Sequence, residues 1–115
     1  QAIGHIILIS DKDAFVSVSG ASKKDYIERK ISNELEGIMD GRKATLIVEE
    51  GKTIPLHNDE DAGEYSNQVI APIIAEGDAI GAVMILSKTP GEKFSEIELK
   101  LAETAAAFLG KQMEQ

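Results

Sequence analysis

The sequence predicts an α+β domain in which one antiparallel sheet of about six strands is flanked by helices. Two observations lead to this class: apolar runs of strand length are joined by tight polar turns, as in hairpins, and helical patterns open with capping residues. Along the chain these patterns give the order β-β-α-β-β-β-β-α. The 115 residues are enough for one domain with its own core, so we expect a single domain over residues 1–115.

The composition excludes several kinds of chemistry. Aromatic residues make up 4% of the chain and tryptophan is absent, so the core must consist mainly of Ile, Leu, Val and Ala. There is no cysteine, which excludes disulfides, thiolate nucleophiles, thiolate zinc sites and thioether-linked cofactors. Such a composition fits a reducing, cytoplasmic environment.

Charge and hydropathy argue against two classes of partner. The 12 basic and 20 acidic residues give a net charge of −8, whereas binding to duplex DNA usually requires a basic face. No apolar run approaches the ~20 residues needed to span a bilayer, and no signal-peptide pattern opens the chain, so we expect no membrane partner. Because the chain begins with Gln and enters a strand almost at once, we interpret it as part of a longer protein.

The first predicted element is a hairpin. The run "HIILIS" is apolar and rich in β-formers, "DKDA" supplies turn residues, and "FVSVS" alternates as a strand does. This alternation divides the second strand into two faces, with Val16 and Val18 on one and Phe15, Ser17 and Ser19 on the other.

A helical pattern follows the hairpin. Ser22 fits a helix N-cap, with Asp25 three residues later in the capping-box position, and Gly41 fits the C-terminal end. Ser32 also fits an N-cap, so the pattern allows a break near Ile31 and a second helix after it. The apolar stripe of this pattern contains Tyr26, Ile27, Ile31, Leu35, Ile38 and Met39.

The middle of the chain combines strand signals with turns. Residues 44–57 fit a strand, a tight turn at Glu50 and Gly51, and a second strand that Pro55 restricts to an edge. Residues 58–64 form an acidic loop. Residues 65–87 give the strongest β signal, a hairpin that turns at Glu76-Gly77-Asp78. Its second strand is apolar at nearly every position, which is typical of a central strand covered on both faces.

The last element is a helix with two apolar faces. Ser95 and Glu98 form the capping box that opens it. A helix that lies on one sheet needs a single apolar face, so a second face indicates a second neighbour. We favour a homodimer, or a higher homo-oligomer, built on this helix; burial within the chain is the alternative. The first face contains Ile97, Leu101, Thr104 and Phe108. The predicted dimer interface contains Leu99, Ala102, Ala106, Leu109, Met113 and Phe108.

Motifs for catalysis or metal binding cannot be assembled. The stretch "SVSGASKKDY" has one glycine where a P-loop needs two, and neither Lys23 nor Lys24 follows a serine by three residues. Free amides and two lysines at a helix start can hold an anion, but a turn capped by Ser22 explains the same residues. The acidic loop lacks EF-hand spacing, and His5 and His57 have no nearby nucleophile or further ligand. We therefore expect no catalytic residue, no metal and no cofactor.

Polar residues on the apolar sheet point to a binding pocket. Small apolar residues with a few convergent polar groups describe a small-molecule pocket, and they describe a solvent-facing sheet margin equally well. The predicted pocket residues are Ser17, Ser19, Tyr65, Asn67, Val69 and Ala71. Nothing in the sequence names the ligand.

Three stretches carry a resemblance to a known family. They are "GHIILISDKDAFVSVSGASKKDYIERKIS", "APIIAEGDAIGAVMILSK" and "ETAAAFLGKQMEQ". They closely resemble the C-terminal domain of the stage V sporulation protein T family, transcription regulators of endospore-forming bacteria. The resemblance covers essentially the whole chain. It departs in "GRKATLIVEEGKTIPLHNDEDAGEYSN", residues 41–67, and a ligand lid would lie within residues 42–67.

The resemblance implies a GAF-like regulatory domain that senses an unknown small molecule and dimerises through its terminal helices. It also implies a swapped-hairpin DNA-binding domain, outside this sequence, through which alone DNA would be bound, and a location in the forespore cytoplasm. The signature of cyclic-nucleotide-binding GAF domains is absent. The bilin-binding and methionine-sulfoxide-reducing members depend on cysteine, so we expect no enzyme. The alternative function is a purely structural dimerisation module with a vestigial pocket.

Overall fold

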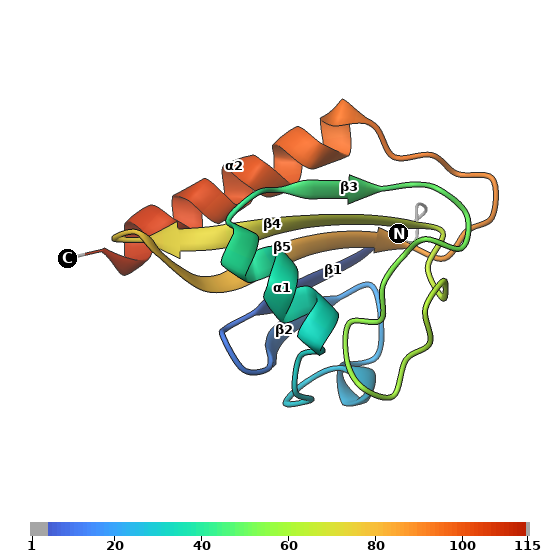
Figure 1. The fold of residues 1–115 in the computed structure, drawn as a ribbon, viewed down its shortest axis with the longest axis horizontal. Helices are drawn as coiled ribbons and strands as arrows, with labels where there is room; N and C mark the ends of the chain where they lie inside the picture. The colour runs from blue at the N-terminus through green and yellow to red at the C-terminus, as the bar shows by residue number, and fades with distance from the viewer. Residues whose placement is uncertain (1–4, 115) are drawn as a thin grey trace.

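The computed structural model describes residues 5–114, and its core is a five-stranded antiparallel sheet with helices on both faces (Figure 1). The strand order across the sheet is β2-β1-β5-β4-β3, which confirms the α+β class. The strands are β1 (Ile6–Ser10), β2 (Phe15–Ser19), β3 (Thr45–Ile47), β4 (Asn67–Ala75) and β5 (Asp78–Ser87). The helices are the short 3-10 turn η1 (Lys23–Asp25), α1 (Asn33–Gly41) and α2 (Glu96–Met113).

The N-terminal hairpin forms as predicted, but its second strand does not alternate regularly. Ile9 pairs with Ser17 while the next residue of β1, Ser10, pairs with Phe15, so Val16 is the extra residue of a β-bulge. The bulge turns Phe15 into the core and leaves Ser17 on the opposite face of the sheet. The prediction that these two side chains share a face was therefore wrong.

The helix predicted from Ser22 begins ten residues later, after Ser32. The Ser22 side chain makes no capping hydrogen bond, and only a 3-10 turn follows it. Backbone bonds from Phe15 N–H to the Arg29 carbonyl (3.3 Å) and from Glu28 N–H to the Phe15 carbonyl (3.1 Å) tie the next residues to the edge of β2 instead. The break near Ile31 is confirmed, since the Ser32 hydroxyl accepts from Leu35 N–H (3.0 Å) and α1 starts there.

The sixth predicted strand, in the second half of residues 44–57, is absent from the described part of the chain. The backbone of this segment is bonded by the amide side chain of Gln68 and not by a neighbouring strand. Its Oε1 accepts from Ile54 N–H (2.9 Å) and its Nε2 donates to the Ile54 carbonyl (2.7 Å). Pro55, which has no N–H, cannot extend this pairing into a ladder.

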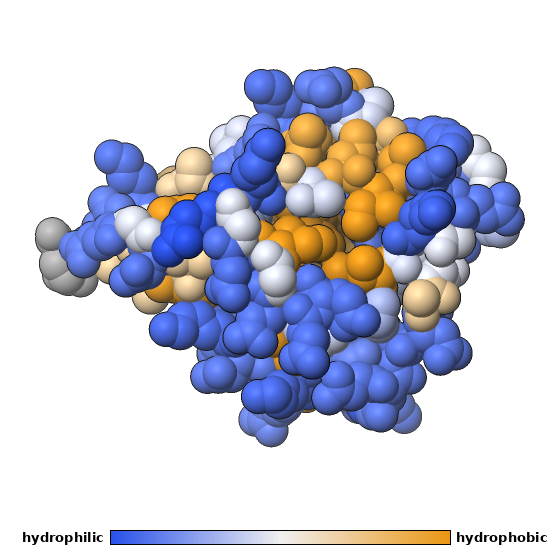
Figure 2. Space-filling model, in the orientation of Figure 1, coloured by the Kyte–Doolittle hydropathy of each residue, from blue (hydrophilic) through white to orange (hydrophobic). Residues whose placement is uncertain are grey.

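The sheet separates two apolar cores. Helix α1 and the long loop between β3 and β4 cover one face, over Leu8, Ile70 and Met84, while α2 covers β4 and β5 on the other, over Val69 and Val83 (Figure 1). Figure 2 looks onto the α1 face, where polar surface surrounds a large apolar patch. β5 is buried along most of its length, as expected for a central strand covered on both faces.

Helix α2 lies unusually close to the sheet at Gly110. A Cβ atom built there would lie 2.2 Å from the backbone oxygen of Ile74 in β4. The absence of a side chain at this position lets the last turns of α2 approach the strand, and Ala102 and Ala106 continue the same contact line with small, buried side chains.

Candidate functional site

The six side chains predicted to form a pocket are not brought together. Ser17 and Ser19 are exposed on the edge strand β2, and strands β1 and β5 lie between it and β4. Val69 and Ala71 are buried beneath α2 in the core of that face. Tyr65 belongs to the opposite core, on the α1 side. A single pocket that contains all six is therefore incompatible with the strand order and with the bulge in β2.

Asn67 has a structural position within this set. Its Nδ2 donates to the Glu92 carbonyl (2.8 Å), and its Oδ1 accepts from Phe94 N–H (2.9 Å). Asn67 is fully buried, and these two bonds give its side-chain amide the partners that a buried polar group needs. They also fix the connection between β5 and α2 to the start of β4.

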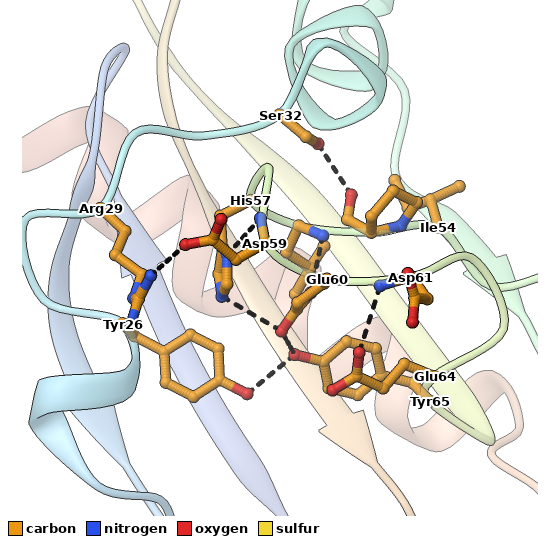
Figure 3. Close-up of polar contacts among 12 residues, drawn as sticks. Tyr26, Arg29, Ser32, Ile54, His57, Asp59, Glu60, Asp61, Glu64 and Tyr65 are labelled. Carbon is orange, nitrogen blue, oxygen red and sulfur yellow. Dashed lines mark hydrogen bonds and ion pairs between the residues drawn. The ribbon is translucent and has the colours of Figure 1, made fainter.

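A buried polar cluster of four side chains lies between the sheet and the long loop (Figure 3). We call Tyr26, His57, Glu60 and Tyr65 the tyrosine–glutamate cluster. The Tyr65 hydroxyl donates to Glu60 Oε2 and lies 2.7 Å from the Tyr26 hydroxyl. Glu60 Oε2 is also 3.5 Å from His57 Nε2, and Glu60 Oε1 accepts from Leu56 N–H (2.8 Å). The Glu60 carboxylate is thus buried with donors on both oxygens.

The cluster joins two parts of the chain. Tyr26 follows η1, whereas His57, Glu60 and Tyr65 lie in the long loop between β3 and β4. Tyr26 and His57 pack edge-to-face with centroids 5.9 Å apart. Phe15, turned inward by the bulge, contacts the ring of Tyr26 in the same way, also at 5.9 Å.

Burial sets the protonation of both hydroxyls. It raises the pKa of Tyr65 strongly above its ordinary value, and the hydrogen bond to Glu60 raises it further. Burial likewise raises the pKa of Tyr26, against a smaller opposing effect of its bond to Tyr65. Both phenols therefore stay protonated in the folded protein and can serve as hydrogen-bond donors.

Beside the cluster is a polar cavity of about 250 Å³. Two ion pairs lie at its rim, Arg29 to Asp59 at 2.5 Å and Lys88 to Glu64 at 3.4 Å. The cavity is lined by Asp25, Tyr26, Arg29, His57, Asp59, Glu60, Glu64 and Lys88. It offers charges of both signs, together with aromatic edges, to a small polar molecule.

Within residues 5–114, no group of three or more His, Asp or Glu side chains is arranged to hold a metal ion. Over the same residues, no helix is both long enough and apolar enough to span a bilayer.

Sequence reasoning missed the tyrosine–glutamate cluster because its members are spread over 40 positions. Tyr26 was assigned to a helix stripe, and Glu60 was assigned to a solvated acidic loop. The one local signal is Tyr65 itself, which was predicted as a site residue, although with the wrong neighbours.

The two apolar faces of α2 are present, but their roles differ from those predicted. Ala102 and Ala106 are buried against the sheet, with Leu99 and Leu109 packed beside them. These four residues were predicted in the dimer interface and instead fix the helix to its own sheet, which corrects that assignment. Phe108 and Met113, from the same prediction, are 61% and 62% exposed.

The outward face of α2 is the first face described from the sequence. Ile97 is 69% exposed, Leu101 is 59% exposed, and both lie on the same side of the helix as Phe108 and Thr104. Among the described residues, no element of the chain covers them. We call Ile97, Leu101, Thr104 and Phe108 the outward stripe.

Comparison with known proteins assigns the chain a family and a fold. Over residues 1–114 it matches the family described as "Stage V sporulation protein T C-terminal, transcription factor". It is 47% identical over 117 residues to stage V sporulation protein T of Bacillus subtilis (strain 168), a match that covers all of this chain and 62% of that protein. The chain thus spans 62% of the length of this curated relative.

Two solved structures share the fold. A GAF domain/HD domain protein from Geobacter sulfurreducens gives a TM-score of 0.68 at 16% identity, covering 94% of this chain and 80% of that one. The type II free methionine-R-sulfoxide reductase from Thermoplasma acidophilum gives a TM-score of 0.68 at 12% identity, covering 92% and 76%. At such identities the likeness shows the fold alone, which is GAF-like.

Proposed function

Because this chain belongs to the family of stage V sporulation protein T C-terminal domains, we propose that it is the sensing and dimerising domain of a sporulation transcription factor. In this proposal it passes the state of a small ligand to a DNA-binding part outside the 115 residues. The net charge of −8 supports a role in which DNA is contacted only by that other part. The site of action is the bacterial cytoplasm, in the forespore.

The outward stripe is the observation that carries the proposal. Three large apolar side chains on one exposed helix face are costly to leave in water and are typical of an interaction surface. The stripe follows the 4-3-4 spacing of a coiled-coil seam, which fits a second helix better than it fits a globular partner.

A second copy of the chain is the occupant that this stripe suits. In an antiparallel pair related by a twofold axis, Ile97 would face Phe108 of the other copy and Leu101 would face its Thr104. The stripe is therefore complementary to itself, as an isologous interface requires. Ala105, which borders the same surface, is small enough to let two helices approach closely.

The ligand site we propose is the cavity beside the tyrosine–glutamate cluster. It combines the buried Glu60 carboxylate, the protonated phenol of Tyr26 and the exposed cations of Arg29 and Lys88 around a space of about 250 Å³. A small polar molecule of this size finds donors and acceptors there without a large rearrangement of the sheet.

A structural dimerisation module with a vestigial pocket is the second candidate. It is favoured by the α1 face of the sheet, where Leu8, Leu56 and Met84 are fully buried in a well-filled core. A thermal-shift screen with metabolites and nucleotides separates the two. Stabilisation that Tyr26→Phe abolishes supports sensing, and no stabilisation by any compound supports the structural module.

A catalytic role is not part of the proposal. The redox chemistry of the cysteine-dependent GAF relatives requires a thiol that this chain lacks.

The dimer is tested by light scattering on two neighbouring substitutions. Phe108→Glu adds a charge to the outward stripe, whereas Ala107→Glu adds the same charge to the next, exposed position off the stripe. We expect twice the 12.4 kDa chain mass for the natural sequence and for Ala107→Glu, and a lower mass for Phe108→Glu. A monomeric natural protein at tens of micromolar would end the proposal.

A further inference from the structure

The tip of the long loop, residues 58–64, has a single inward side chain. Along these seven residues only Glu60 has a buried side chain, which is 5% exposed. The other side chains of the tip are exposed or, at Gly63, absent. The tip therefore buries no apolar side chain that would hold it on the fold.

The segment on the N-terminal side of the tip is fixed much more firmly. Ser32 donates from its N–H to the Leu56 carbonyl (2.9 Å) and from its hydroxyl to the Pro55 carbonyl (2.7 Å). Gln68 holds both backbone groups of Ile54. These bonds join buried or half-buried residues of the loop to α1 and β4, so they form a rigid base beneath a polar tip.

Ion pairs at the surface of the tip contribute little to holding it on the fold. The Arg29–Asp59 pair has side chains 39% and 74% exposed, and the Lys88–Glu64 pair has side chains 48% and 37% exposed. Ion pairs at such exposure are screened by solvent and contribute weakly. The bonds of Glu60 to Leu56 N–H and to the Tyr65 hydroxyl are charge-assisted and buried, and such bonds are about twice as strong as neutral ones.

We infer that residues 58–64 open as one unit from a fixed base, and that the Glu60 carboxylate is the latch that controls the opening. When Glu60 releases Tyr65 and the tip opens, the hydroxyls of Tyr26 and Tyr65 (Figure 3) become accessible. The neighbouring polar cavity then becomes larger. The use of this motion to admit a ligand rests on the proposed function, whereas the motion itself does not.

Amide hydrogen exchange, measured by NMR on the protein without any ligand, tests the latch. The reporters are the N–H groups of Leu56, bonded to Glu60, and of Gly63, bonded to the Thr53 carbonyl (2.8 Å). The reference is the ladder between β4 and β5. Glu60→Gln keeps the shape of the side chain but gives Tyr65 a poorer acceptor, so we expect about tenfold faster exchange at both reporters and unchanged exchange in the ladder.

Two further variants make the outcome decisive. Tyr65→Phe removes the same hydrogen bond from the other side and keeps the ring in the core, so it is expected to reproduce the local effect. Glu64→Gln neutralises the other glutamate of the tip and is expected to change exchange less than twofold. Equal effects of Glu60→Gln and Glu64→Gln, or exchange of the reporters at the rate of the ladder in the natural protein, would overturn the latch. Neither result depends on whether a ligand binds.

Discussion

The close approach of α2 to β4 makes Gly110→Ala an informative substitution. Alanine normally stabilises a helix relative to glycine by about 1 kcal/mol. At Gly110, however, the new Cβ would lie 2.2 Å from the Ile74 oxygen, and that oxygen belongs to the backbone of a buried strand. Restoring an ordinary contact requires α2 to move by roughly 1 Å, which separates Ala106 and Leu109 from their neighbours in the sheet.

We expect Gly110→Ala to lower the free energy of unfolding by about 1–3 kcal/mol, the usual cost of overpacking. Gly37→Ala is the matched control, because Gly37 is also helical but has no atom within 4 Å of its added Cβ. That variant is expected to raise the free energy of unfolding by about 0.5–1 kcal/mol. Urea titrations followed by circular dichroism, all at one protein concentration, measure both. If both glycine variants stabilise the protein equally, α2 does not approach β4 as described.

Three shorter predictions follow from the same structure. Ser32→Ala removes the cap of α1 and one donor to Pro55, and is expected to cost about 1–2 kcal/mol of stability in the same urea assay, whereas Ser22→Ala, which removes no capping bond, should cost almost nothing. Equal losses of stability in the two variants would contradict the assignment of Ser32, and not Ser22, as the N-cap. The chain has two tyrosines and no tryptophan, so absorbance at 295 nm reports only Tyr26 and Tyr65. Folding raises the pKa of both phenols above 10.0, so the native state holds these protons more tightly than the unfolded state does. Their contribution to the free energy of unfolding is therefore fully present below about pH 10 and is lost as the pH rises above it. Phenolate absorbance should therefore appear only as the circular dichroism of the fold is lost, and reversible ionisation near pH 10 in folded protein would contradict the buried cluster. Finally, Asn67→Ala leaves the Phe94 N–H and the Glu92 carbonyl without their partner, and is expected to cost about 2 kcal/mol in the urea assay; a loss under half of this would show that the connection to α2 is held otherwise.

The fold was predictable where local signals and tertiary structure agree. The two hairpins and α2 are fixed by patterns within a few residues, namely the turn at Glu76-Gly77 and the capping box of Ser95 and Glu98, and each is present. The N-terminus of α1 was ambiguous because Ser22 and Ser32 both fit a cap. Only the pairing of residues 27–30 with the edge of β2 decides between them, and that contact spans more than ten positions.

The candidate site was much less predictable, because it depends on a bulge and on side chains that are far apart in the sequence. A single extra residue, Val16, inverts the faces of β2 and removes Ser17 from the set of residues that face the core. The Gln68 side chain bonds the backbone of Ile54, where a strand was predicted, and no periodicity in the sequence indicates this contact. For α2, the amphipathic pattern gave two faces correctly, but which face the sheet takes depends on the small side chains that permit close packing, Ala102 and Ala106.

Disulfide formation by a single introduced cysteine tests the central proposal most directly, because the natural chain contains none. Thr104→Cys lies near the proposed twofold axis of two antiparallel α2 helices, and Lys12→Cys, in the exposed turn between β1 and β2, is the control. Under mild oxidation we expect rapid covalent dimer formation by Thr104→Cys at low micromolar protein and little by Lys12→Cys. Equal, slow crosslinking of the two variants would show that the outward stripe does not join two copies of this domain.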